Sequence, residues 1–271
     1  MKRIRKRILI VASILMTILV FLGFVGMWAI KKGLSPLVDG AQLQDGKVTV
    51  IVDNTSPMPV VAYLLKFNDG NLGLIDATMD PKAKAICSAL RRMGRSVSDV
   101  KVIFCTHTHD DHTAGCNQFP NATIYAMKNP IQGKNPSNLS HWNRLQRALP
   151  SNDQDPAHPK NWDIRYLSDG QVLDFNGERI EAFALPGHTY DSCAYLAFGV
   201  LFMGDSAAGQ YNGQIGSAPP FVSVDRNLNQ RELKKLATRL QQRKREINYL
   251  AFGHQGPIKG LAPLLAWASS H

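Results

Sequence analysis

The first 32 residues lack any acidic side chain, and residues 8–30 lack charge altogether. The whole chain of 271 residues carries 31 Lys and Arg against 21 Asp and Glu, a formal charge of +10. Without the first 32 residues the balance is 24 against 21, which is +3 for the remaining 239. So small a charge is not the basic footprint of a nucleic-acid-binding domain, and no nucleic-acid partner is expected.

Cysteine is also scarce, with four residues in the chain: Cys87, Cys105, Cys116 and Cys193. Their spacing matches neither a zinc knuckle nor a Cys-X-X-Cys motif, and they allow three complete disulfide pairings between which the sequence does not choose. Cys105 lies in an apolar run, which is typical of a small core residue. With 44% hydrophobic residues, the chain is expected to fold as one globular domain or two small ones.

The uncharged run at residues 8–30 predicts a single transmembrane anchor. As a helix its 23 residues would measure about 35 Å, which is enough to cross a bilayer. A cleaved signal peptide is the alternative, but Met27-Trp28-Ala29 is a poor cleavage site.

Five Lys and Arg precede this run and two follow it. The more basic flank, residues 1–7, is therefore expected to be a cytoplasmic segment. Residues 31–45 are expected to be a linker, and residues 46–271 a catalytic domain outside the cytoplasm, in a periplasm or extracellular space. Cleavage of the run would leave that domain secreted.

Strands and helices are expected to alternate along the domain, as in an α/β fold. A helix is expected to open at Asp80-Pro81 and to end at Gly94. Residues 229–247 predict an amphipathic helix, residues 207–223 a loop, and residues 128–165 a long polar excursion of the kind that often covers a site. Strands are expected at residues 47–54, 60–67, 72–76, 100–105, 164–167, 172–175, 179–185, 194–198 and 201–203.

The most informative segment, residues 106–112, reads Thr-His-Thr-His-Asp-Asp-His and follows an expected strand. In extended chain, residues two apart point the same way, so His107 and His109 can hold one cation. Asp111 and His112 come later, where the chain turns toward a helix, and can face a second cation. Imidazole and carboxylate ligands suit zinc, and also iron or manganese.

Three further side chains also follow expected strands: His188, Asp205 and His254. Each alone is a weak signal. Together they complete two sets, with His107, His109 and His188 for one metal and Asp111, His112 and His254 for the other. Asp205 is then left to bridge the two metals.

With these motifs the sequence resembles the metallo-β-lactamase-fold hydrolases over roughly residues 46–260. The resemblance implies an α/β fold, a four-layer αββα sandwich with two divalent metals, expected to be zinc, at one edge. It also implies that Asp76, in Leu-Ile-Asp-Ala-Thr, orients a ligand histidine rather than binding metal. Asp111 is expected to handle protons in addition to its role as a ligand.

The expected function is hydrolysis of a small ester, lactone, thioester or amide by hydroxide held between the metals. Zinc β-lactamases carry Cys or Ser in place of Asp205, and acyl-homoserine lactonases carry Tyr in place of Ala208. Only 17 residues follow His254, too few for the helical domain of glyoxalase II-like thioesterases. The alternatives are a persulfide dioxygenase-like enzyme with one iron and a non-catalytic, metal-stabilised binding module.

Overall fold

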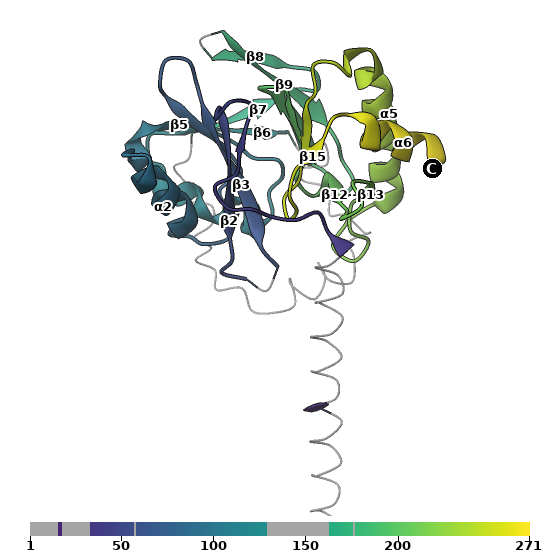
Figure 1. The fold of residues 1–271 in the computed structure, drawn as a ribbon, viewed down its shortest axis with the longest axis horizontal. Helices are drawn as coiled ribbons and strands as arrows, with labels where there is room; N and C mark the ends of the chain where they lie inside the picture. The colour runs from purple at the N-terminus through teal and green to yellow at the C-terminus, as the bar shows by residue number, and fades with distance from the viewer. Residues whose placement is uncertain (1–15, 18–32, 57, 129–162, 176) are drawn as a thin grey trace, which may run out of the picture.

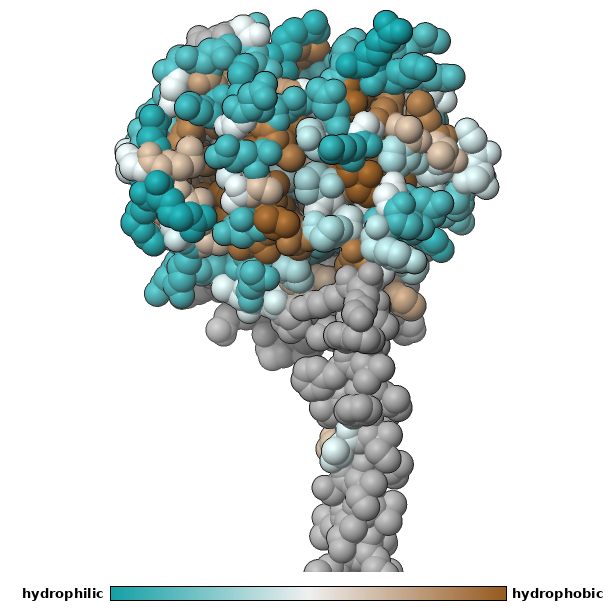
Figure 2. Space-filling model, in the orientation of Figure 1, coloured by the Kyte–Doolittle hydropathy of each residue, from teal (hydrophilic) through white to brown (hydrophobic). Residues whose placement is uncertain are grey.

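A computed structural model describes residues 16–17, 33–56, 58–128, 163–175 and 177–271 of the chain. Within these residues, two mixed β-sheets pack face to face, and helices cover their outer faces (Figure 1). This arrangement is the predicted four-layer αββα sandwich. Figure 2 shows hydrophilic side chains over most of one face of the molecule, with apolar side chains in smaller patches between them.

The first sheet is built from the N-terminal half of the domain, and its strands follow one another in chain order. The earlier strands pair antiparallel, and the later ones, from β4 on, pair parallel. The strands are β1 (Gln42–Leu43), β2 (Val48–Asp53), β3 (Val60–Lys66), β4 (Leu72–Ile75), β5 (Val100–Phe104), β6 (Thr123–Met127) and β7 (Ile164–Leu167). Parallel strands carry their carboxyl ends to one edge, where the loops after β4 and β5 meet.

The second sheet has the order β15-β14-β11-β10-β9-β8. Its strands are β8 (Val172–Phe175), β9 (Glu178–Ala184), β10 (Cys193–Ala197), β11 (Val200–Phe202), β14 (Tyr249–Ala251) and β15 (Ile258–Lys259). β11 and β14 run parallel, so the loops after them also share one edge. A separate hairpin of β12 (Ala207–Gly209) and β13 (Ile215–Ser217) follows β11.

Strand β5 shows how the sequence pattern builds the layers. Val102 and Phe104 point into the core between the two sheets, whereas Ile103 and Cys105 point into the core beneath helix α2 (Lys84–Arg92). This alternation is what an extended strand buried on both faces requires. The second sheet is covered in the same way by α5 (Arg226–Leu240) and α6 (Ala262–Ser270).

Several expected elements have different limits in the structure. Helix α2 begins at Lys84 rather than at Pro81, because Ala83 takes a left-handed conformation with a φ of 43°. Asp80 still accepts hydrogen bonds from the backbone N–H groups of Lys82 and Lys84. Helix α5 ends at Leu240 instead of Ile247, the expected loop 207–223 contains the β12–β13 hairpin, and α6 was not expected.

Part of the expected linker is packed into the domain. Leu34 pairs with Gln210, and the backbone N–H of Ser35 donates to the carbonyl of Gly209 at 3.0 Å. The predicted anchor at residues 8–30 lies outside the described residues except for Met16 and Thr17, and so do residues 129–162 of the polar excursion. No helix in the described parts of the chain is long and apolar enough to cross a membrane.

All four cysteines are free thiols, so none of the three possible pairings is formed. Cys105 is buried in the core, as its apolar surroundings predict, and so are Cys116 and Cys193. Cys87 is half-buried on α2. None of the four sulfur atoms belongs to the groups of possible metal ligands found among the described residues.

Candidate metal centre

Asp76, at the end of β4, organises the loop that carries the first histidines. Its carboxylate accepts hydrogen bonds from the backbone N–H of Thr106 at 2.7 Å and from the Thr106 hydroxyl at 2.8 Å. It also accepts one from Nδ1 of His112 at 2.9 Å. Asp76 has a φ of 57°, a left-handed conformation that a non-glycine residue adopts at a cost. Three hydrogen bonds to a buried carboxylate hold this turn in place, which is how such strain persists at functional sites.

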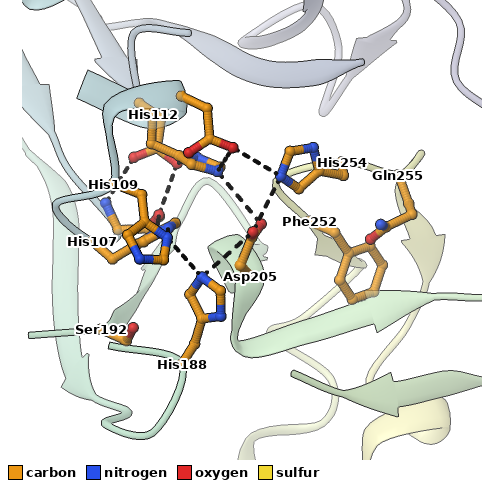
Figure 3. A network of polar contacts seen from close by, with 12 residues as sticks. His107, His109, His112, His188, Ser192, Asp205, Phe252, His254 and Gln255 are labelled. Carbon is orange, nitrogen blue, oxygen red and sulfur yellow. Dashed lines mark hydrogen bonds and ion pairs between the residues drawn. The ribbon is translucent and has the colours of Figure 1, made fainter. Parts of the chain in front are cut away.

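Three imidazoles meet in front of this loop (Figure 3). Nδ1 of His109 lies 3.1 Å from Nε2 of His107 and 3.1 Å from Nε2 of His188. His107 and His109 follow β5, and His188 comes from the loop between β9 and β10 of the other sheet. We call this set the imidazole half of the centre.

A second set contains the carboxylate of Asp111, which lies with His112 on the short helix α3 (Asp110–Thr113). Nε2 of His254, from the loop after β14, is 3.4 Å from Oδ2 of Asp111. Nε2 of His112 is 3.7 Å from the same oxygen. We call Asp111, His112 and His254 the carboxylate half.

Asp205 stands between the two halves, on the turn that follows β11 (Figure 3). Its Oδ2 is 3.6 Å from Nε2 of His188 and 3.1 Å from Nε2 of His254. Its Oδ1 is 3.5 Å from Nε2 of His112. One carboxylate therefore faces ligands of both sets, which is the position that the sequence predicts for a bridging residue.

In four of the histidines, Nδ1 points away from the centre and is held by a hydrogen bond to another residue of the chain. Nδ1 of His107 lies 3.1 Å from the Thr106 hydroxyl, and Nδ1 of His254 donates to the Pro59 carbonyl at 2.8 Å. Nδ1 of His188 lies 3.2 Å from the hydroxyl of Ser223, which itself donates to the Pro219 carbonyl. With the bond from His112 to Asp76, these contacts leave four Nε2 lone pairs directed at the centre, as metal-binding histidines require.

The donor set fits divalent cations. The ligand atoms fall into groups of His107, His109 and His188, of His107, His112 and Asp205, and of Asp111, His112 and His254, each within 4.8 Å. Nε2 of His112 is buried and makes no hydrogen bond, an expensive arrangement for a polar atom unless another partner satisfies it. A Cβ on Gly253 would overlap Oδ1 of Asp205 and lie 2.6 Å from Cε1 of His112, so glycine there keeps this space open.

Burial lowers the pKa of a histidine and a nearby carboxylate raises it, and a different one of these effects prevails in each half. Burial lowers the pKa of His107 well below its usual value and that of His188 to about 4, so these imidazoles are neutral donors. Burial also opposes a charge on His254, but Asp205 and Asp111 outweigh it and raise the pKa to about 10. The carboxylate half therefore attracts positive charge.

The structure brings together all seven side chains predicted to bind metal, and it places Asp76 behind them. The contributions of Ser223 and of the Pro59 carbonyl are not predicted from the sequence, because no motif marks either residue. Two aromatic side chains on the segment after Asp205, Tyr211 and Phe221, are 71% and 84% exposed.

A sandwich of two sheets with histidines and aspartates at the ends of its strands defines a class of metal-dependent enzymes. A family model described as the metallo-beta-lactamase superfamily matches residues 55–254. The chain belongs to this superfamily, which confirms the predicted family.

Similarity to individual proteins is lower and in part local. A hydroxyacylglutathione hydrolase of Aeromonas hydrophila is 27% identical over 135 residues, which cover 48% of this chain and 42% of that protein. The chain thus spans about two-fifths of the length of this relative.

The solved structures support the fold. A metallo-beta-lactamase family protein of Thermus thermophilus has a TM-score of 0.60 at 21% identity, over 83% of this chain and 77% of that one. A mutant of a flavo di-iron protein from Thermotoga maritima has a TM-score of 0.59 at 19% identity, over 87% of this chain and 62% of that one.

Proposed function

We propose that the chain is a metal-dependent hydrolase that holds two divalent cations, with zinc as the preferred metal, and acts on a small ester, lactone, thioester or amide. The observation that carries this proposal is Asp205, whose carboxylate faces ligands of both halves at 3.1–3.6 Å. When bound, two such cations activate water and polarise the bond under attack.

The chain's own residues would orient the reaction. Asp76 and Thr106 fix the imidazoles from behind, while burial of His107, His112 and His188 excludes water from that side. The side chain of Asp111 is 31% exposed, compared with 13% for His254. Oδ2 of Asp111 lies 3.4 Å from Nε2 of His254 and would face the same cation, while the other carboxylate oxygen would accept a proton from the open side.

Substrate preference can be narrowed by two positions. Asp205 stands where the zinc β-lactamases that the sequence resembles carry Cys or Ser, which argues against β-lactam hydrolysis. Ala208, three residues after Asp205, stands where the acyl-homoserine lactonases carry Tyr, which argues against this kind of lactone as the substrate. The complete carboxylate half argues against a persulfide dioxygenase, which needs only two histidines and an aspartate for one iron.

The reaction is tested by assaying the full chain, purified in detergent, against esters, lactones, thioesters and amides, with and without a chelator. Turnover of one class that is lost on chelation and regained with zinc is the expected result. Chelator-sensitive oxygen consumption with a persulfide would favour the dioxygenase instead. Stoichiometric metal with no turnover of any substrate would favour a binding module.

The location of the enzyme is part of the proposal. Residues 8–30 would anchor the chain in a membrane, with residues 1–7 in the cytoplasm and the domain outside it, because the more basic flank precedes the run. A reporter fused after His271 that functions only outside the cytoplasm is the expected result. A reporter that functions only in the cytoplasm would contradict this orientation.

A further inference from the structure

The segment that follows Asp205 is unusual for a chain in which 19% of the residues are charged, since residues 206–224 contain no charged side chain. Two large apolar side chains project from it: Tyr211, which is 71% exposed at the tip of the β12–β13 hairpin, and Phe221, which is 84% exposed. Exposed apolar residues that are scattered singly need no explanation, so the case for a contact surface depends on where these two are attached. We call the exposed side chains of Tyr211 and Phe221, with the uncharged residues 210–214 and 219–222 that carry them, the apolar rim.

The apolar rim is bound to the chain that follows the predicted anchor. The backbone N–H of Tyr211 donates to the carbonyl of Gly33 at 3.1 Å, and Leu34 pairs with Gln210. Ile30, the last residue of the uncharged run, is three residues before Gly33. Because extended chain covers at most about 3.6 Å per residue, the hairpin tip lies within about 14 Å of the end of that run, including the hydrogen bond.

The apolar rim is also bound to the metal centre. The backbone N–H of Val224 donates to the carbonyl of His188 at 3.0 Å, and the Ser223 hydroxyl holds the ring of the same histidine. On the other side, the N–H of Gly209 donates to the side chain of Gln255, the residue after His254. One short segment therefore joins ligands of both halves to the start of the domain. In Figure 1, β12 and β13 lie at the lower end of the domain, beside its first described residues.

We propose that the apolar rim rests in the headgroup region of a phospholipid bilayer and turns the metal centre toward the membrane surface. This inference rests on the anchor proposed above for residues 8–30. Tyrosine favours the interface because its ring is apolar and its hydroxyl is polar, and an uncharged segment loses little hydration there.

Spin labels on the full chain in vesicles test this contact without requiring any enzymatic activity. Cys87→Ser removes the half-buried thiol, and the other three thiols are buried, so Phe221→Cys or Tyr211→Cys provides one reactive site. Met93→Cys is the matched control, because Met93 is 41% exposed at the end of α2, before the start of β5 and so at the edge opposite the centre.

In vesicles of phosphatidylcholine and phosphatidylglycerol, labels at 221 and 211 are expected to show a several-fold higher ratio of collisions with dissolved oxygen to collisions with a water-soluble nickel chelate than the label at 93. Flotation of the vesicles reports the anchor separately. If the chain floats but all three labels give the same ratio, the apolar rim does not touch the bilayer and the anchor proposal stands. If the chain does not float, the anchor and this inference both fail.

Discussion

The two halves of the centre differ in what holds them and in the charge they carry. The imidazole half has three neutral nitrogen donors, and its outer hydrogen bonds come from the hydroxyls of Thr106 and Ser223. The carboxylate half adds Asp111 and is backed by the Asp76 carboxylate and the Pro59 carbonyl. The two halves are therefore adjacent but unequal, and the carboxylate of Asp205 faces both.

Replacement of Asp205 is expected to have the largest effect, because it acts on both halves. Asp205→Asn keeps the shape but removes the negative charge that faces His112, His188 and His254. We expect activity to fall by about a thousandfold, which corresponds to several kcal/mol of lost transition-state stabilisation, with loss of bound metal.

Asp45→Asn is the matched control for that measurement. Asp45 lies in a turn beside Tyr249, at the start of β14 and therefore at the end of the sheet away from the centre. Its φ of 54° is one that asparagine accepts readily. Equal activity losses in the two variants would contradict a bridging role for Asp205.

Gly253→Ala is expected to disturb the carboxylate half through His112, and the shared Asp205 with it. The new methyl group would overlap Oδ1 of Asp205 and lie 2.6 Å from Cε1 of His112, so both side chains must move. We expect a loss of about a hundredfold in activity, since a misplacement of about 1 Å at a reacting centre has this cost. Gly216→Ala is the control, because its nearest neighbour would be 3.5 Å away. Full activity and two metals in Gly253→Ala would show that this geometry is wrong.

Asp76→Asn is expected to weaken both halves through the residues it positions. The amide has one acceptor oxygen where the carboxylate has two. At least one of the three groups that now donate to Asp76, from Thr106 and His112, would therefore face an NH2 group and lose its hydrogen bond. Residues that orient metal ligands typically contribute about 10–100-fold, and we expect a loss of that order in metal affinity, measured by competition with a chelating dye. An unchanged metal affinity would contradict a positioning role for Asp76.

Ser223→Ala is expected to give the smallest effect and to act on the imidazole half. The substitution removes the hydroxyl that lies 3.2 Å from Nδ1 of His188. It leaves the hydrogen bond between His107 and Thr106 in place. We expect a loss of about tenfold in affinity for one metal and little change for the other. Thr238→Ala, which removes an exposed hydroxyl on α5, is the control and is expected to leave both metal affinities unchanged. Equal weakening of both metals would mean that the two halves are not separable in this way.

Sequence reasoning succeeds where local chemistry is concentrated. The run from His107 to His112 follows a strand whose alternation marks it as buried, so its position at a sheet edge can be predicted from the sequence. The sequence also predicts that His188, Asp205 and His254 lie near this run, and their side chains do lie beside it. That these side chains bind metal stays a prediction. The layered fold is predicted from these elements and from the family resemblance that they carry.

The parts that sequence reasoning misses depend on contacts between distant segments. Ser223 reaches His188 across 35 positions, and Pro59 reaches His254 across 195, with residue types that signal nothing by themselves. The left-handed turn at Ala83 makes α2 begin at Lys84, later than expected. The pairing of Leu34 with Gln210 packs part of the expected linker against the domain. In each case the tertiary arrangement decides the outcome, and local propensity does not.

We expect two divalent cations to occupy the two adjacent halves, with Asp205 shared between them. Anomalous diffraction from crystals of the zinc-loaded protein, recorded on both sides of the zinc absorption edge, measures this occupancy directly. Two zinc peaks are expected, one among His107, His109 and His188 and the other among Asp111, His112 and His254, with Asp205 between them. A single peak, or a fully active protein with no peak, would contradict this expectation.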